Sequence, residues 1–421
     1  MFAVADLEAG IMESDGMLRH VAFFEELAKL DESDPSWRSV SAGLVAMRLV
    51  DRWFAGERSA AESWAVNAVR GAIEEVPETT PLRRILSAII DTMTAASPVE
   101  THTLCPRLIA YGQALEYDAK WSLGADVYQT VAENADAEAD ADLVVTALIR
   151  LAVCYKNLGD LDTAARAYDR ASVVALAAGD LIGVLNARLG DATIAMARGN
   201  MPKAESILEE TLEKAESAGL DDIRSRALTH RAFIAGSVGR HEQGIRFSYD
   251  ALELSKTQRD RDRILTNIAT GFRYLGLMDV ARDAYLVLAA TAQEQYIRWM
   301  SELNLMELAA EQGMELDFDK YRRDLALADF SPQLRVTYLL HVGRGYNAIG
   351  NAEAGIPYLE RAIQMASEYK LNQLLFEAEE ALVDARRRGE RAVARTLGAV
   401  NASIRVVIDA IHNMKETAGI A

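Results

Sequence analysis

Apolar and polar residues alternate along this chain with the period of an α-helix, and one stretch shows the pattern most completely. In Leu148–Ala171, apolar residues recur three and four positions apart on two successive segments. Gly159 and Asp160 separate the two segments. Glycine readily adopts the left-handed backbone conformation that often ends a helix. The stretch is therefore predicted to form two helices joined by a short turn.

The same turn recurs at nearly constant spacing through most of the chain. Successive turn positions are 40, 40, 40, 37, 37, 37 and 39 residues apart. A small residue usually follows five positions later and a bulky one nine positions later, although Phe318 and Gly398 depart from this pattern. The turn positions are Ala119, Gly159, Gly199, Gly239, Gly276, Gly313, Gly350 and Gly389. The spacing predicts an array of about eight helix pairs.

A single helix pair cannot bury its apolar face alone, so neighbouring pairs must stack. The chain is therefore predicted to be all-α. Residues 1–104 are expected to form degenerate helical pairs, and residues 105–402 the regular solenoid. In residues 403–421, apolar residues such as Ile404, Val407 and Ile411 share one helix face. We expect this segment to cap the open end of the array; the alternative is a helix that forms a homodimer.

The residues of the repeat resemble a known family. The pattern consists of Leu148, Leu151, Ala152, Tyr155, Gly159, Ala164, Tyr168 and Ala171. It looks like the tetratricopeptide repeat (TPR), and the resemblance covers roughly residues 105–400. The spacing exceeds the family's usual 34 residues, as in kinesin light chains and the superhelical sensor domains of some bacterial transcription activators. The resemblance implies a right-handed solenoid whose concave side binds a peptide or protein.

In the family's geometry, the first helix of each pair lines the concave groove. Twenty groove positions in the second to fifth copies include four basic residues and no acidic one. The whole chain has 63 acidic and 45 basic residues and a formal net charge of -18. The sixth copy instead brings Glu307 and Glu311. The candidate binding residues are Lys156, Asn157, Asn186, Arg226, Phe233, Arg263, Arg273, Tyr274, Arg344 and Asn347.

These residue types favour an extended acidic ligand. Arginine binds carboxylates in a bidentate manner, and asparagine can hydrogen-bond a peptide backbone. Phe233 and Tyr274 would accept an apolar side chain. The alternative is that the arginines pair with carboxylates of neighbouring helices, such as Asp222 or Asp262.

Charge and residue composition argue against several classes of function. The acidic balance argues against nucleic acid as the partner. The two cysteines provide neither a disulfide framework nor a zinc site, and no catalytic or cofactor-binding motif is evident. We therefore expect no cofactor, no metal and no catalysis. No long apolar run or signal peptide is seen, so no membrane association and a cytoplasmic location are expected.

These observations predict a non-catalytic scaffold or regulatory adaptor that binds an extended, acidic peptide or protein segment in its groove. The alternative is a signalling sensor that reads a small molecule or short peptide and controls a separate output protein.

Overall fold

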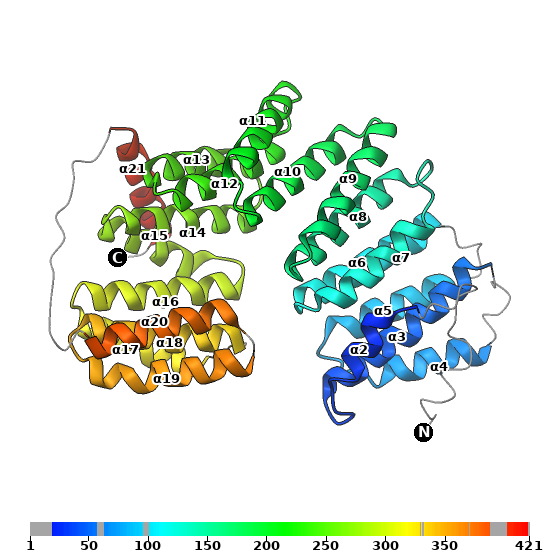
Figure 1. The fold of residues 1–421 in the computed structure, drawn as a ribbon, viewed down its shortest axis with the longest axis horizontal. Helices are drawn as coiled ribbons and strands as arrows, with labels where there is room; N and C mark the ends of the chain where they lie inside the picture. Colours follow the sequence, from blue (N-terminus) through cyan, green and yellow to red (C-terminus); the bar gives the residue numbers. More distant parts are fainter. Residues whose placement is uncertain are drawn as a thin grey trace. The chain divides into compact units, whose positions relative to one another are not determined.

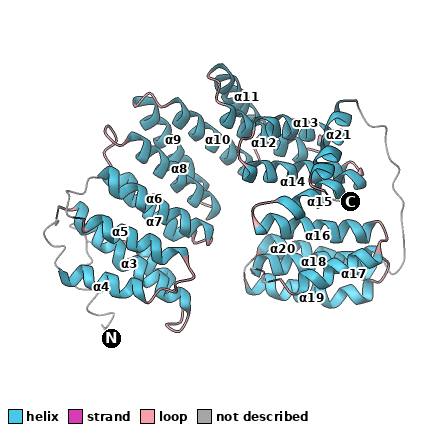
Figure 2. Ribbon diagram, turned by 180° about the vertical axis from the view of Figure 1, so that it is seen from behind, coloured by secondary structure: helices cyan, strands magenta, loops and turns pink. Residues whose placement is uncertain are grey.

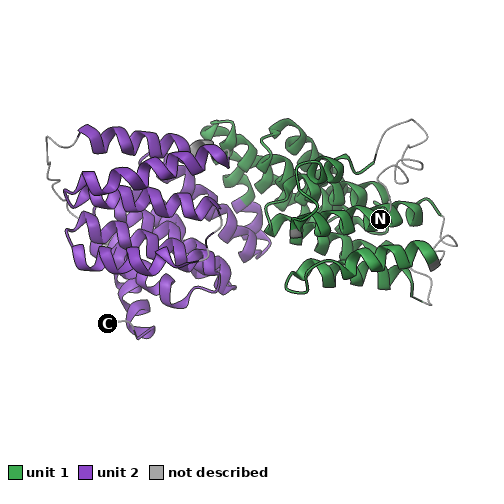
Figure 3. Cartoon of the chain, turned by 90° about the horizontal axis from the view of Figure 1, so that it is seen from below, with its two compact units in different colours: residues 1–211 green, residues 212–421 purple. Residues whose placement is uncertain are grey.

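The computed structural model describes residues 19–56, 63–95, 101–328, 330, 332–369, 371–387 and 402–419. In these ranges the chain forms twenty helices and no strand (Figures 1 and 2). The predicted all-α repeat solenoid is thus confirmed. The chain divides into two compact units, residues 1–211 and residues 212–421 (Figure 3).

The described part of the first unit contains nine helices and most of a tenth, α11, within which the division between the units falls. The helices are α2 (Val21–Leu27), α3 (Pro35–Phe54), α4 (Ser63–Glu74), α5 (Pro81–Met93), α6 (Thr101–Tyr117), α7 (Trp121–Asn134), α8 (Ala141–Asn157), α9 (Leu161–Ala177), α10 (Leu181–Ala197) and α11 (Met201–Ser217). From α5 to α10, each helix packs on the next. Stacking therefore proceeds in chain order, as expected for helical repeats.

The second unit continues the same arrangement. Its remaining helices are α12 (Asp221–Ser237), α13 (His241–Leu254), α14 (Gln258–Tyr274), α15 (Met278–Thr291), α16 (Gln295–Glu311), α17 (Glu315–Ala326), α18 (Pro332–Ala348), α19 (Ala352–Glu368), α20 (Asn372–Arg387) and α21 (Ala402–Thr417). The first helices of successive pairs, α12, α14, α16, α18 and α20, also contact one another in sequence. They form one layer, and this layer carries the second unit's candidate residues.

The predicted turn positions have the expected backbone conformation. The six glycines of the second to seventh copies all have positive φ, from 71° at Gly313 to 85° at Gly159. Ala119 also has a positive φ of 56°, although an L-residue with a side chain rarely adopts it. The register is therefore confirmed from Ala119 to Gly350, whereas Gly389 lies outside the described residues.

The long repeat period arises from long helices. Each helix from α8 to α12 has 17 residues. Gly179 and Gly219 also have positive φ and end α9 and α11. The extra residues of Ser172–Gly183 thus mainly extend helices rather than the connection between them.

The departure at Phe318 has a packing reason. This residue stands where other copies have a small side chain, yet it is only 1% exposed. A Cβ atom at Gly345 would lie 2.3 Å from Phe318 Cε2. Gly345 thus supplies the space that the bulky ring requires, and close packing of the helices is retained.

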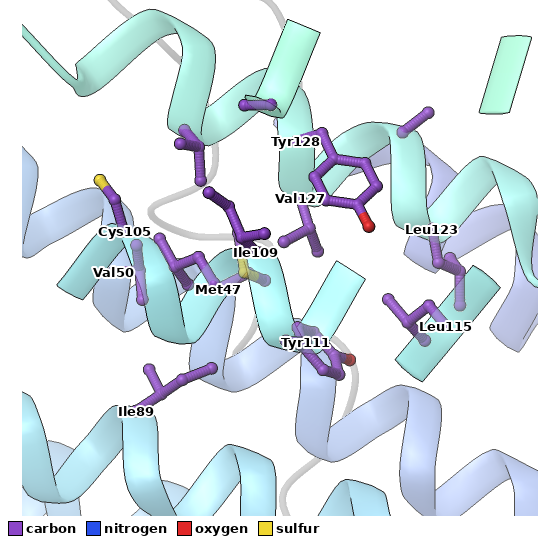
Figure 4. Packing of buried hydrophobic residues seen from close by; sticks show 14 of the residues in the cluster. Met47, Val50, Ile89, Cys105, Ile109, Tyr111, Leu115, Leu123, Val127 and Tyr128 are labelled. Carbon is purple, nitrogen blue, oxygen red and sulfur yellow. The ribbon is translucent and has the colours of Figure 1, made fainter. Parts of the chain in front are cut away.

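One apolar core runs through the first unit and passes the predicted boundary at residue 104. It begins at Phe23 and includes side chains from α3 to α10. In Figure 4, Met47 and Val50 of α3 lie near Ile109 of α6 within this cluster. The observed division into residues 1–211 and 212–421 therefore differs from the predicted one. The less regular helical pairs pack by the same apolar contacts as the regular repeats, and the predicted boundary at residue 104 stays a prediction.

His20 connects three elements of the first unit. It precedes α2, and its Nε2 lies 2.9 Å from Asp51 Oδ2 of α3. Its Nδ1 hydrogen-bonds to Asp126 of α7. Burial alone would lower the pKa of His20, but the hydrogen bonds and charges of the two carboxylates raise it to about 9. His20 is therefore charged in the folded protein at neutral pH.

This pairing predicts a pH-dependent stability. The folded pKa lies above the unfolded value of about 6.5, so the stabilisation is complete below about pH 6.5 and is lost as the pH rises through about 9. We expect a loss of up to about 3 kcal/mol across this window. In the His20→Gln variant, the free energy of unfolding measured with urea should lose this part of its dependence on pH.

His102→Gln provides the control, because His102 is an exposed side chain of the same unit. Its unfolding free energy should retain the wild-type slope. A wild-type slope in the His20→Gln variant as well would contradict the assignment.

Helix α21 forms where the apolar pattern predicts, but it does not cover the last helix pair. It packs on α13 and α15 of its own unit (Figure 1). Ile404, Val407 and Ile411 are at most 2% exposed in the core cluster shared with those helices. The expectation of a cap over the open end is therefore wrong. The helix stripe was evident from the sequence, whereas the surface that it covers depends on contacts between distant segments.

Candidate binding surface on the first helices

The ten candidate residues all lie on first helices of the repeats. In the first unit, Lys156 and Asn157 end α8 and Asn186 lies on α10. The residues of the second unit are Arg226 and Phe233 on α12, Arg263, Arg273 and Tyr274 on α14, and Arg344 and Asn347 on α18. The predicted groove from Lys156 to Arg273 includes residues of both units, and it stays a prediction.

In the first unit, Lys156 and Asn157 lie at the C-terminal end of α8, whereas Asn186 lies within α10. Asn157 donates a hydrogen bond from Nδ2 to the Val153 carbonyl oxygen at 2.8 Å. Lys156 is half-buried, and burial lowers its pKa. In the described part of the chain no carboxylate forms an ion pair with this ammonium group. An acidic ligand would therefore find an uncompensated charge at Lys156.

In the second unit, Arg263 belongs to a compact exposed group. Its guanidinium contacts both carboxylate oxygens of Glu294, with three N–O distances of 3.2 to 3.3 Å. Arg259 also reaches Glu294, with Nε 2.6 Å from Oε1. The side chains of Arg259 and Arg263 are 55% and 54% exposed. Two exposed arginines thus share one carboxylate, and one positive charge remains in excess.

Arg273 is less exposed than Arg263, and its guanidinium contacts two carboxylates. Its Nη1 lies 2.7 Å from Glu307 Oε2, and its Nη2 lies 2.7 Å from Glu311 Oε1. These bonds join α14 to α16, since the arginine and the two carboxylates lie on first helices of consecutive pairs. The arrangement confirms that an arginine of the candidate set pairs within the protein. The partners are not the expected Asp222 or Asp262.

The same ionic contacts extend to α18 and α20. His341 Nδ1 lies 3.4 Å from Glu307 Oε2, and Arg344 Nη2 lies 3.5 Å from Glu377 Oε2. Arginines on α14 and α18 thus alternate with carboxylates on α16 and α20. We call Arg273, Glu307, Glu311, His341, Arg344 and Glu377 the inter-repeat ion network. The inter-repeat ion network includes residues from the first helices of four successive repeats, α14, α16, α18 and α20.

Glu307 is the most buried member of the inter-repeat ion network, with 7% of its surface exposed. Burial alone would raise its pKa, but attraction to His341 and Arg273 lowers it to about 2. For Arg273, burial opposes the charge, yet Glu307 and Glu311 hold its pKa above the ordinary value. Both groups are therefore charged and bonded to each other at neutral pH.

Aromatic side chains flank the charged residues. Phe233 is 59% exposed and Tyr274 is 70% exposed. The Tyr274 ring stacks on His241 of α13, with centroids 4.8 Å apart and an angle of 8° between the planes. Asn347 is half-buried, and no hydrogen-bond partner of its Oδ1 is found among the described residues. The first helices of this unit thus present apolar rings beside hydrogen-bonding groups.

Sequence reasoning placed Glu307 and Glu311 at groove positions, but it did not identify them, or Glu294, as partners of the arginines. Glu307 lies 37 residues after Thr270 and 37 residues before Arg344, at the same position of the repeat. This register was the signal that a carboxylate of one copy meets the arginine of the preceding copy. Glu294 precedes the helix of its copy, so no groove position identified it.

The described residues include two buried cysteines. Burial raises the pKa of Cys105 and of Cys154 to about 12, which leaves both as poorly reactive thiols. Among the residues that the structure describes, no three His, Cys, Asp or Glu side chains are placed to hold a metal ion. In that same part of the chain, every helix is too short or too polar to cross a membrane.

Comparison with known proteins supports the repeat interpretation. Residues 145–172 match the family model for the tetratricopeptide repeat. This match covers most of α8 and most of α9, the pair from which the repeat pattern was defined. The TPR resemblance is thus confirmed at that pair. No curated protein matches the sequence.

Several solved helical structures show a distant similarity. The quorum sensor NprR from B. thuringiensis, in its apo form, has 14% identity and a TM-score of 0.46, covering 81% of this chain and 92% of NprR. A Rap protein complexed with Competence and Sporulation Factor has 12% identity and a TM-score of 0.42, covering 83% and 98%. BtubC from P. vanneervenii has 17% identity and a TM-score of 0.39, covering 46% and 84%.

Proposed function

We propose that this chain, a repeat protein of tetratricopeptide type, is a non-catalytic scaffold that binds an extended acidic peptide or protein segment. The contact surface would be the exposed side of α12 and α14. Arg259, Arg263, Phe233 and Tyr274 would make the principal contacts. We call these four residues the α12–α14 surface.

The observation that carries this proposal is the shared carboxylate of Glu294. Arg259 and Arg263 are both exposed, and together they have one acidic partner at ion-pair distance among the described residues. An incoming carboxylate can therefore bind a guanidinium without displacing every internal bond. Charge-assisted hydrogen bonds of this kind are among the stronger polar contacts.

The aromatic rings supply the second part of the contact. Phe233 and Tyr274 expose most of their surface, although large apolar side chains are usually buried. Exposed aromatic side chains are frequent anchors in protein interfaces. An acidic segment that also carries an apolar residue would thus match the α12–α14 surface.

Arg273 has a different role in this proposal. Its guanidinium is held by Glu307 and Glu311 and joins consecutive repeats. Its replacement would disturb the fold as well as any ligand contact. A test of binding is therefore better directed at the exposed arginines.

The proposal predicts a charge-selective interaction. A random peptide library selected on the full chain should yield acidic sequences with an apolar residue. Binding of a selected peptide, measured by fluorescence anisotropy, should weaken at least about tenfold in Arg259→Glu/Arg263→Glu, since each lost charged contact contributes about 1.5–3 kcal/mol. Raising the salt concentration should weaken wild-type binding as well.

Arg361→Glu/Arg387→Glu is the matched control, because both arginines are exposed in the same unit and lie on α19 and α20. This variant has the same change of charge and should bind like the wild type. Selection of peptides without acidic residues, or equal binding by all three proteins, would refute the proposal.

A further inference from the structure

Helix α21 occupies a surface far from its neighbours in the sequence. It follows α20 in the chain, but it packs on α13 and α15. These two are second helices of their pairs, whereas the candidate residues lie on α12 and α14. Helix α21 is therefore a separate element that docks on a surface of the stack, and it does not continue the repeat.

The docking contact has an apolar stripe. Ile404, Val407 and Ile411 follow each other at intervals of three and four residues and are at most 2% exposed. They belong to one cluster with residues of α13 and α15, and Ile408 and Met414 pack at its margin. Such spacing is typical of an amphipathic helix that binds across other helices. We call the contacted surface of α13 and α15, including Asp283, the α21-docking face.

A charged anchor fixes the register of this helix. Asp283 of α15 is only 8% exposed, and Lys415 Nζ lies 3.1 Å from its Oδ1. His412 Nε2 lies 3.5 Å from Asp283 Oδ2. A buried carboxylate without a cation nearby would be costly, so Asp283 selects a helix with a positive group at this position. The α21-docking face thus has both an apolar and a charge requirement.

We propose that the α21-docking face is a helix-acceptor site and that α21 of a second copy of this chain is its alternative occupant. Helix α21 is the occupant whose fit to this face the structure demonstrates. The same side-chain contacts form whether the helix belongs to the same chain or to another copy. Whether the face binds the helix of its own chain or that of another copy depends on the effective concentration of the tethered helix. At micromolar concentrations the wild-type chain is therefore expected to keep its own helix docked.

Two complementary full-length variants test the exchange. Ile411→Asp disrupts the apolar stripe and leaves the α21-docking face intact. Asp283→Lys leaves the helix intact and places a cation opposite Lys415. Each variant alone is expected to be monomeric, whereas an equimolar mixture should form a one-to-one dimer in native mass spectrometry and analytical ultracentrifugation. In the dimer, the intact helix of one copy occupies the intact face of the other.

A charge-reversed double variant is the matched control. Asp283→Lys/Lys415→Glu restores opposite charges within one chain, so its own helix should remain docked. Mixed with Ile411→Asp, it should give far less dimer than Asp283→Lys does. Hydrogen exchange in residues 402–417 would show docking or release of the helix in each protein.

A synthetic peptide of residues 402–417 shows whether the acceptor face is intact in Ile411→Asp. Binding of this peptide together with a dimer in the mixture would support the proposal. Peptide binding without dimer formation would overturn a second copy as the occupant. Failure of both, with helical content retained, would show that the face accepts α21 only within its own chain, and would also overturn the proposal. None of these outcomes bears on the α12–α14 surface.

Discussion

Replacement of Glu307 by alanine is expected to destabilise the second unit by about 3–5 kcal/mol at neutral pH. Glu307 is buried, and its carboxylate lies 2.7 Å from Arg273 and 3.4 Å from His341. Removal of this charge leaves a guanidinium that is three-quarters buried with Glu311 as its remaining ion-pair partner. The unfolding free energy, measured with urea and circular dichroism, would give the loss.

Glu360→Ala is the comparison, because Glu360 forms an exposed ion pair with Arg386 in the same unit. Exposed pairs of this type contribute about 0–1 kcal/mol, so this variant should unfold almost like the wild type. Similar losses in both variants would show that the inter-repeat ion network has no special structural role.

The pH dependence of this effect has a defined direction. The pKa of Glu307 is lowered to about 2 in the folded protein, from an unfolded value of 4.5. A lowered carboxylate pKa stabilises the fold above the unfolded value, and the contribution is lost as the pH falls toward 2. The difference between wild type and Glu307→Ala should therefore decrease as the pH is lowered from 4.5.

The second large effect is expected for Gly190→Ala in the first unit. Gly190 lies in α10, and a Cβ atom there would stand 2.1 Å from Cε1 of the Tyr168 ring. Tyr168 is 3% exposed, so its ring has little space to move away. Overpacking of a core typically costs about 1–3 kcal/mol, and we expect the upper end of this range. Urea unfolding of the full chain is the measurement.

Gly71→Ala separates this overlap from the ordinary effect of replacing a helical glycine. Gly71 lies in α4 of the same unit and is exposed, and among the described residues no atom beyond its own stretch of helix lies within 4 Å of an added Cβ. Alanine is favoured over glycine in a helix by about 1 kcal/mol, so this variant should be as stable as the wild type or more so. A stabilised Gly190→Ala variant would contradict the packing argument.

Helices and turns were the parts of the fold that the amino-acid pattern could predict. The turn at Gly159 needs a positive φ, and glycine provides it from local backbone freedom alone. The apolar spacing in Leu148–Ala171 likewise follows from the period of a single helix. The placement of the candidate residues on first helices followed from the same register.

The ionic state of the candidate surface was less accessible to sequence reasoning. Arg263 and Arg273 were predicted as ligand contacts, and both have carboxylate partners 31 to 38 residues away. Repeat register identifies the helix that follows, but the particular side chains that meet depend on helix angle and rotamer. The exposed arginines that share Glu294 became evident only when both helices were in place.

Local backbone preferences and apolar periodicity were sufficient to establish the helix pairs, their turns and the stripe on α21. The pairing of Arg273 with Glu307 and the docking of α21 on α13 and α15 were decided by the folded chain. Such contacts join residues that are distant in sequence, and their energy depends on burial and on mutual geometry. A helical stripe states that an apolar face must be covered, but several surfaces of a repeat stack can cover it.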